Sequence, residues 1–359
     1  MNVRYLCLQA TRKGDASYAH VHEIVDGLRR RGVHVTLYET TYSSGTAKPG
    51  RFAYLAEFLR VQARVLREIQ KGDLLYVRFH FAAAPAVWWA KRRGIKMAVE
   101  VNGPYEDLFI AWPMMARVRR LATWMMQLQL KLPDRVIVVT EQLRQWVGER
   151  IPGARVEVIS NGANTKVFHP NATSDIPVSA PFAMFFGSFA KWQGLDALLA
   201  APQQPNWPTG VSLVLAGEGI EQEAVEQAHR AGTVNYVGRL SQDDVAGLLA
   251  KSVGSLIPKN DVGDRKGTGL MPLKLFESMA CGVPVVVTDF PGMADVVRED
   301  ACGIVIPPED PLALAQAVAD LVADPARAQD MGRNGLTAAV EKHSWDARAQ
   351  DTYDLLSAL

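Results

Sequence analysis

The first candidate for chemistry in this 359-residue chain is Glu277, a glutamate in an otherwise apolar and small-residue segment. It lies between Phe276 and Ser278 and follows a stretch that contains Gly267 and Gly269. Glycines let a backbone approach a ligand closely because they carry no Cβ. A carboxylate beside such a loop can accept two hydroxyl hydrogen bonds at once, which suits the vicinal diol of a ribose. The alternative is a solvated glutamate on a helix, and this stretch alone favours neither.

The elements that position Glu277 follow from the spacing of apolar residues. Apolar residues recur at helical spacing from Met271 to Cys281, and Pro272 is tolerated in a first helical turn. Gly282 comes just past the helix end, where a left-handed residue is favoured. The run 283–287 is then almost continuously apolar, which is typical of a parallel strand covered on both faces. The sequence therefore predicts a glycine-rich loop, a helix and a buried strand.

The same alternation of strands and helices extends through the chain. Strands are expected at 3–8, 33–38, 73–78, 96–101, 134–139 and 156–160, and later at 182–186, 211–216, 254–257 and 303–307. A polar segment with three prolines, residues 170–181, separates the two halves. We therefore predict an α/β protein with domains at residues 1–170 and 171–342 and a terminal helix at 343–359.

Polar residues follow two of the predicted strands of the first half. His80 comes after the strand at 73–78, and Glu100 and Asn102 lie at the end of the strand at 96–101. Residues at the carboxyl ends of parallel strands tend to line the ligand crevice of an α/β sheet, so these three are the candidate catalytic residues. A lone histidine is more often structural than catalytic, and that alternative remains open for His80.

A resemblance to a known family rests on the segment ESMACGVPVVVTDFPGMADVV, which begins at Glu277. It resembles the donor-nucleotide region of GT-B glycosyltransferases of the family 4 type, the glycosyl transferases group 1. In that family a Glu-x7-Glu motif precedes the helix end, and Glu277 matches the second glutamate, which holds the ribose of a sugar nucleotide. Gly269 stands at the position of the first glutamate. NGANTKVF at 161–168 and HSW at 343–345 also resemble the family's hinge and the start of its last helix.

The resemblance implies a GT-B fold, in which two Rossmann-like domains face a cleft and a C-terminal helix crosses back to the N-terminal domain. It also implies an arginine and a lysine on the donor diphosphate, but Ser188 and Gln193 stand at those positions. The expected donor-binding residues are Gly187, Ser188, Lys191, Gly217, Arg265, Gly269, Leu273, Lys274 and Glu277. The first loop, with Arg12, Lys13 and Gly14, corresponds to a family loop that lines the cleft and faces the acceptor.

Charge differs between the two halves of the chain. Residues 1–170 contain 26 Lys and Arg against 14 Asp and Glu, a net +12, whereas residues 171–359 contain 13 against 24, a net −11. The segment 112–132 combines Trp and Met residues with Arg117, Arg119, Arg120 and Lys131, a composition typical of an interfacial amphipathic helix. We expect the basic half to contact a membrane surface or an anionic acceptor. The alternatives are a helix that covers the sheet and two domains that attract each other.

The resemblance implies a retaining hexosyltransferase that moves a sugar from a UDP- or GDP-sugar, and we expect a lipid-linked or glycan acceptor in polysaccharide or glycoconjugate synthesis. The preferred acceptor is anionic and linked to polyprenyl diphosphate. The expected location is the cytoplasm, peripherally on the inner face of the membrane, with no nucleic-acid partner. Neither cofactor nor metal is expected, because the chain lacks an Asp-x-Asp motif and GT-B enzymes generally need no metal.

Two alternatives to this function remain. The first is a nicotinamide oxidoreductase, but the glycine fingerprint that begins at Gly217 has Gln222 in its third position and is incomplete. The second is a GT-B protein that binds a sugar nucleotide without turnover, because the first family glutamate and the phosphate-binding arginine are both replaced.

Overall fold

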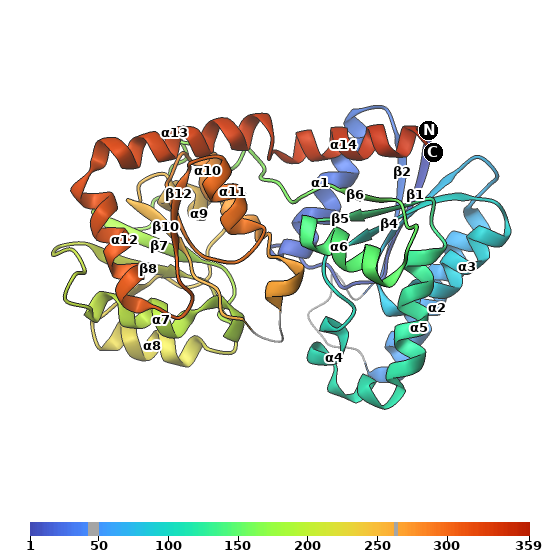
Figure 1. Ribbon diagram of the computed structural model, residues 1–359, viewed down its shortest axis with the longest axis horizontal. Helices are drawn as coiled ribbons and strands as arrows, with labels where there is room; N and C mark the ends of the chain where they lie inside the picture. The colour runs from blue at the N-terminus through green and yellow to red at the C-terminus, as the bar shows by residue number, and fades with distance from the viewer. Residues whose placement is uncertain (42–49, 262–264) are drawn as a thin grey trace. The chain divides into compact units, whose positions relative to one another are not determined.

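The computed structural model describes residues 1–41, 50–261 and 265–359, and the chain divides into two compact units. The first unit comprises Met1–Ser160 and Asp346–Leu359, and the second comprises Asn161–Trp345 (Figure 1). The boundary predicted from the sequence is residue 170, whereas the structure divides the chain after Ser160. The reason is a backbone pairing within the second unit: Ala163 N–H donates to His343 O at 2.8 Å, and Trp345 N–H donates to Ala163 O at 3.0 Å.

The first unit is built on a six-stranded sheet in which every pair of neighbouring strands is parallel, in the order β2-β1-β3-β4-β5-β6. Its strands are β1 (Asn2–Cys7), β2 (His34–Glu39), β3 (Leu74–Arg78), β4 (Lys96–Val101), β5 (Arg135–Val138) and β6 (Val156–Val158). The flanking helices are α1 (Ala16–Arg30), α2 (Arg51–Glu68), α3 (Ala84–Arg92), α4 (Asp107–Ala111), α5 (Arg119–Lys131) and α6 (Glu141–Arg150), with the 3₁₀ turns η2 (Phe81–Ala83) and η3 (Pro113–Val118). β3 is buried at every position, as expected for a strand with helices on both faces.

The second unit repeats this plan with the strand order β12-β11-β10-β7-β8-β9, again wholly parallel. Its strands are β7 (Phe182–Phe186), β8 (Ser212–Ala216), β9 (Asn235–Tyr236), β10 (Gly254–Ile257), β11 (Val285–Thr288) and β12 (Gly303–Ile306). Its helices are α7 (Leu195–Ala200), α8 (Gln222–Arg230), α9 (Gln242–Leu249), α10 (Leu273–Ala280), α11 (Met293–Glu299), α12 (Pro311–Ala323) and α13 (Pro325–Glu341), with 3₁₀ turns η4 (Lys191–Gln193), η5 (Ala201–Gln203) and η6 (Arg265–Thr268). The predicted loop, helix and strand around Glu277 are η6, α10 and β11.

Both sheets reverse their strand order beside their first strand. In the first sheet the chain passes from β1 to β2 on one side and to β3 on the other, and in the second it passes from β7 to β8 on one side and to β10 on the other. At such a switch point the loops that leave the carboxyl ends of the two central strands diverge and leave a crevice for a ligand. The topology therefore favours a site after β1 and β3 in the first unit, and after β7 and β10 in the second.

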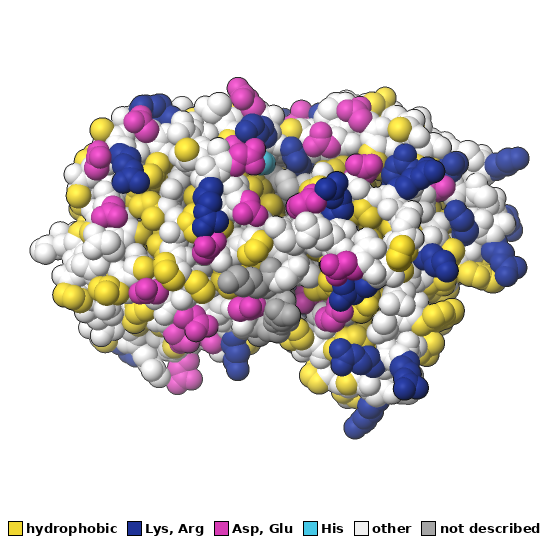
Figure 2. All heavy atoms as spheres, viewed as in Figure 1, with side chains coloured by type: hydrophobic (Ala, Val, Ile, Leu, Met, Phe, Trp, Pro, Cys, Tyr) yellow, Lys and Arg dark blue, Asp and Glu magenta, His cyan; other side chains and the backbone are white. Residues whose placement is uncertain are grey.

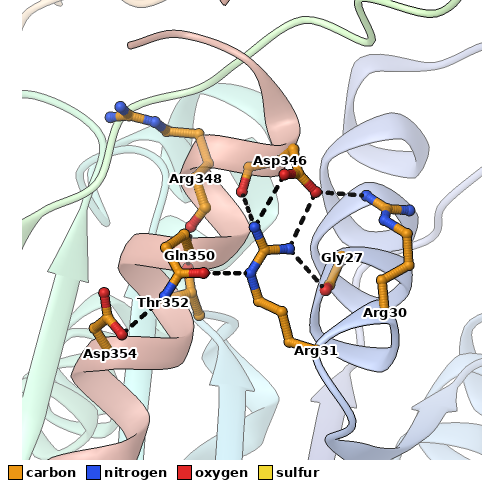
Figure 3. Close-up of polar contacts among 8 residues, drawn as sticks. All are labelled: Gly27, Arg30, Arg31, Asp346, Arg348, Gln350, Thr352 and Asp354. Carbon is orange, nitrogen blue, oxygen red and sulfur yellow. Dashed lines mark hydrogen bonds and ion pairs between the residues drawn. The ribbon is translucent and has the colours of Figure 1, made fainter. Parts of the chain in front are cut away.

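The last helix, α14 (Trp345–Ser357), packs on α1 in the first unit (Figure 1). Arg31 joins the two helices: its guanidinium donates to both carboxylate oxygens of Asp346 at 3.0 and 3.1 Å, to Gln350 Oε1 at 2.7 Å and to Gly27 O at 3.1 Å (Figure 3). Gly27 lies against Ala349, and a Cβ at position 27 would overlap the Ala349 side chain. A residue without a side chain is therefore what permits the close packing of α14.

The segment expected to form one helix at 112–132 is divided in the structure. The 3₁₀ turn η3 precedes α5, because Val118 has backbone angles of −116° and 25° that interrupt the helix. Among the described residues, no helix combines the length and apolar character needed to span a bilayer.

Candidate functional site

Two buried lysines meet at one amide oxygen in the second unit. Lys259 Nζ donates to Gln193 Oε1 at 2.7 Å, and Lys274 Nζ donates to the same atom at 3.2 Å. The lysines are only 6% and 7% exposed. Gln193 belongs to the loop after β7, Lys259 follows β10, and Lys274 lies in the first turn of α10. The cluster is therefore at the switch point of the second sheet.

Local geometry fixes this lysine pair. Gln193 Nε2 donates to Ser188 Oγ at 3.2 Å, which leaves the amide oxygen facing the lysines. The backbone N–H of Lys259 donates to Thr288 Oγ1 at 3.0 Å, which ties the residue to the end of β11. Gly187 has a φ of +118°, and a Cβ there would lie 3.1 Å from Lys274 Nζ. A glycine at position 187 therefore makes room for the Lys274 ammonium beside the first strand.

Electrostatics at the lysine pair favour an anion. Burial, and then the positive charge of Lys259, hold the pKa of Lys274 well below its ordinary value, while Glu277 acts in the opposite direction. The Lys274 ammonium also lies over the Phe185 ring, 4.0 Å from its centroid. Bringing a phosphate to two close ammonium groups of low exposure would relieve their mutual repulsion, and charge-assisted hydrogen bonds of this kind are the strong ones.

Glu277 is half-buried one helical turn after Lys274. Burial raises the pKa of Glu277 to about 7, and the neighbouring Lys274 only partly opposes this. Among the described residues, no side chain or backbone group donates a hydrogen bond to the Glu277 carboxylate. Glu277 and Lys274 share one face of α10, so a carboxylate that can accept hydroxyl groups lies near one member of the lysine pair.

The other predicted donor residues differ in how accessible they are to a ligand. Ser188 and Lys191 are exposed in the loop after β7, where they are accessible to a ligand, and Leu273 is the buried first residue of α10. Gly217, by contrast, has a packing role: its φ is +150°, and a Cβ there would overlap the carbonyl oxygen of Gly187. The side chain of Arg265 lies outside the described part of the chain.

The backbone at position 269, where the family has its first glutamate, favours glycine. It has a φ of +71°, in the left-handed region that favours glycine. The adjoining Leu270 pairs with Gly292, and Leu270 N–H donates to Pro291 O at 2.9 Å. A glutamate at position 269 would be strained in this backbone.

Sequence reasoning missed Lys259 and the bridging role of Gln193. The signal for Lys259 was available, because it is a polar residue just after a buried strand, the rule that identified Glu100. The role of Gln193 had no such signal, because it depends on the fold of residues far apart in the chain.

In the first unit Glu100 is the centre of a buried network. Its Oε1 accepts from Arg78 at 2.7 Å and Asn102 at 2.6 Å and lies 2.9 Å from His20 Nε2, and its Oε2 accepts from Tyr76 at 2.6 Å. Burial alone would raise the pKa of Glu100, but the charges of His20 and Arg78 and the hydrogen bonds outweigh it and hold the pKa well below its usual range. Since Glu100 is only 1% exposed and both oxygens are engaged, it is placed to hold Asn102 and His20 rather than to touch a substrate.

His80 lies at the switch point of the first sheet, directly after β3. Its Nδ1 accepts from Ala82 N–H at 3.3 Å, its carbonyl accepts from Gln129 at 2.9 Å, and its ring lies 5.0 Å from that of Phe58. Burial lowers the pKa of His80 to about 4, so the imidazole is neutral at pH 7. The capping contact supports the structural alternative, and the position at the strand end supports the functional one.

The loop after β1 places the predicted acceptor residues at the same switch point. Arg12 is half-buried, Lys13 and Gly14 are exposed, and Gly14 has a φ of +95°. Asp15 N–H donates to Arg12 O at 2.9 Å, which closes the turn before α1. His80 and this basic loop thus follow the carboxyl ends of two neighbouring strands, β3 and β1. The structure contains no cluster of three metal-ligating side chains in the residues it describes.

Comparison with known proteins identifies the family of the chain. Residues 180–324 match the model described as Glycosyl transferases group 1, and residues 19–167 match that of Glycosyltransferase Family 4. The chain belongs to the family 4, group 1 glycosyltransferases. It is therefore an enzyme of the glycosyl-transferring class, with the GT-B fold.

Similar proteins of this family cover almost the whole chain. A phosphatidyl-myo-inositol mannosyltransferase of Mycobacterium leprae is 26% identical over 97% of this chain and 94% of its own. An alpha-maltose-1-phosphate synthase of Mycobacterium tuberculosis is 24% identical over 94% and 93%. Among solved structures, sucrose-phosphate synthase of Thermosynechococcus elongatus has a TM-score of 0.78 at 19% identity, covering 99% of this chain and 98% of its own. The predicted GT-B fold is confirmed.

Proposed function

We propose that this glycosyltransferase moves a sugar, with retained anomeric configuration, from a UDP- or GDP-sugar to a lipid-linked, anionic acceptor. The observation that supports donor binding most directly is the convergence of Lys259 and Lys274 on Gln193 Oε1. In this proposal the two lysines bind the donor diphosphate in place of the cations that Ser188 and Gln193 replace. Glu277 accepts the ribose hydroxyls, and no metal is needed to neutralise the diphosphate.

The acceptor side of the proposal rests on the first unit. His80 follows β3, and Arg12 and Lys13 lie in the loop after β1, at the switch point of the first sheet. The half of the chain that contains them has a net charge of +12. The Mycobacterium leprae relative is named for mannosyl transfer to phosphatidyl-myo-inositol, a lipid, which supports an acceptor held in a membrane. We propose that the enzyme works on the cytoplasmic face of the membrane and contacts it peripherally.

A surface of the first unit supports the membrane contact. Trp112, Met114, Leu121 and Trp124 are exposed large hydrophobic residues on η3, α5 and the residue before them. Figure 2 shows Lys and Arg side chains, in dark blue, among hydrophobic ones over the part of the first unit where α4 and α5 lie. Basic residues near an anionic leaflet add binding free energy of ~1 kcal/mol each, and aromatic side chains favour the interface.

The experiment that tests donor binding is a thermal-shift screen of UDP- and GDP-sugars, with NAD as the comparison ligand. One nucleotide sugar should raise the melting temperature, and Lys259→Met or Lys274→Met should each lower its affinity about tenfold or more, because a charge-assisted hydrogen bond is lost. Lys251→Met is the control and should leave the affinity unchanged, because Lys251 is exposed just after α9 and its ammonium donates to Ser174 O at 3.2 Å. Stabilisation by NAD alone would contradict the proposal.

The rival function is a protein that binds the donor without turnover, and Gly269 at the position of the first glutamate favours it. Release of nucleoside diphosphate during incubation with acceptor lipids separates the two functions. A tightly bound nucleotide sugar that is never consumed would support the rival.

A further inference from the structure

An apolar groove of about 210 Å³ lies on the first unit, between α2, η2, η3 and α5. Its walls include Leu55, Leu59, Phe81, Val118, Leu121 and Met125. Leu59 and Leu121 are 57% and 56% exposed at its rim, so the groove opens to the surface. Contiguous exposed apolar surface that lines a hollow is typical of a binding site.

The groove offers almost nothing polar to a ligand. Gln62 is the polar residue in its lining, and both ends of its amide are used within the protein. Gln62 Nε2 donates to Phe58 O at 3.1 Å, and its Oε1 accepts from Ala86 N–H at 3.2 Å. An occupant therefore gains from burying hydrocarbon and not from hydrogen bonds, which excludes a sugar or a peptide backbone.

The surroundings of the groove are basic. The segment from Trp112 to Lys131 has no Asp or Glu, and Arg117, Arg119 and Arg120 are exposed along it. On the α2 side, Arg60 is 76% exposed and pairs with Glu57 at 3.7 Å, so the excess positive charge of the rim comes from the three arginines of the other side. An occupant that combines an apolar chain with a negative charge fits this pairing of an apolar lining and a basic rim.

The inner end of the groove reaches the candidate acceptor site. Phe58 and Phe81 line the groove, and their rings lie 5.0 and 4.5 Å from the ring of His80, between centroids. His80 follows β3, beside the basic loop after β1. A chain that fills the groove would thus direct its polar end toward the residues proposed to bind the acceptor.

We propose that this groove binds the first part of the acceptor's isoprenoid chain, withdrawn from the bilayer, so that its phosphate end is held at the switch point of the first sheet. The inference rests on the proposed function, because it assumes a lipid-linked acceptor. It adds that the enzyme recognises the hydrocarbon itself and does not only rest on the membrane surface.

The test uses soluble probes and the whole enzyme in detergent-free buffer, below the concentration at which the probes form micelles. Farnesyl phosphate is compared by calorimetry with isopentenyl phosphate, which has the same headgroup on a single isoprene unit. Each added methylene that is buried strengthens binding, so farnesyl phosphate should bind at least about tenfold more tightly. Equal affinity for both probes would overturn the proposal.

Matched variants separate the groove from general membrane contact. Leu59→Glu and Leu121→Glu place a carboxylate at the groove rim and should weaken farnesyl phosphate binding about tenfold or more. Trp124→Glu is the control, because Trp124 is 58% exposed on the same helix α5 and does not line the groove. It should weaken binding to anionic vesicles while leaving farnesyl phosphate affinity within about twofold of the wild-type value.

Two outcomes would overturn this inference while the proposed function remains. If nucleotide sugars stabilise the enzyme but all three variants bind farnesyl phosphate equally, the groove is not the chain site and the donor assignment survives. If Leu121→Glu instead dissociates a dimer seen by ultracentrifugation, the groove is an interface between two copies of the chain, which also overturns the inference.

Discussion

Lys259 and Lys274 share one hydrogen-bond acceptor, the side-chain oxygen of Gln193, at 2.7 and 3.2 Å. They come from different elements of the second unit, the end of β10 and the start of α10. The loop after β7, where the family has its phosphate-binding cations, supplies the neutral residue between them. In this enzyme two buried lysines, one after β10 and one in α10, instead supply positive charge at the switch point.

Replacing the bridging amide by a carboxylate should affect stability and binding in opposite directions. Gln193→Glu changes one amide group to an oxygen anion between two ammonium groups, so the melting temperature of the free enzyme should rise and the pKa of Lys274 should increase. The same anion should repel a diphosphate and weaken its affinity about tenfold or more. Calorimetry with UDP and GDP, alongside thermal unfolding, measures both effects. A variant with lower stability and unchanged affinity would argue against the phosphate role.

Glu277 should make nucleotide binding depend on pH near neutrality. Its pKa in the folded enzyme is about 7, above its usual 4.5, so folding favours the protonated form between these values. Stability of the free enzyme from this group should therefore fall as pH rises through that window. A ribose held by the carboxylate needs the ionised form, so nucleoside affinity should instead increase from pH 6 to pH 8. Uridine and guanosine titrations, with Glu277→Gln as the pH-independent comparison, test this, and a flat wild-type profile would remove the ribose assignment.

Glu100 should contribute to stability and to the geometry of the first unit. Glu100→Gln leaves Arg78 buried without its charge partner, and breaking a buried pair of this kind costs ~3–5 kcal/mol. Because the pKa of Glu100 is held far below its usual value, its contribution is present at neutral pH and is lost as pH falls through the acid range. Urea unfolding at pH 7 measures the loss, and Glu157→Gln, on the exposed part of β6, is the control. A loss no larger than that of the control would exclude a strong buried network.

The packing of α14 on α1 should be sensitive to a single methyl group. Gly27→Ala introduces a Cβ that overlaps Ala349 and should destabilise the docked helix by ~1–3 kcal/mol. Gly148→Ala, in α6 with no atom near its would-be Cβ, should instead stabilise by ~0.5–1 kcal/mol through helix propensity. Hydrogen exchange of the α14 amides reports the docking directly. Equal protection of α14 in both variants would show that Gly27 is not a packing requirement.

How far the sequence could predict the site depended on whether its signal was local. Strand alternation, the glycine at 282 and the Glu277 segment are local patterns, and the strands, α10 and the family were predicted from them. Only one lysine of the pair was predicted: Lys274 was among the expected donor-binding residues, whereas the contact between Lys259 and Gln193 forms between distant parts of the chain. Glu100 was singled out by its place at a strand end, but its burial depends on His20 and Arg78, which no local pattern connects to it.

The central claim, transfer of sugar from a nucleotide donor to a lipid-linked acceptor, is tested most directly with a nucleotide sugar labelled in its sugar. The enzyme is incubated with the stabilising donor and with lipids extracted from the organism that makes it, and label in the organic phase is counted together with released nucleoside diphosphate. The account predicts lipid-extractable label and an equal amount of released nucleoside diphosphate, both reduced about tenfold or more in Lys259→Met. A donor that binds and raises the melting temperature would contradict it if, over the same incubation, no label enters the organic phase and no nucleoside diphosphate is released.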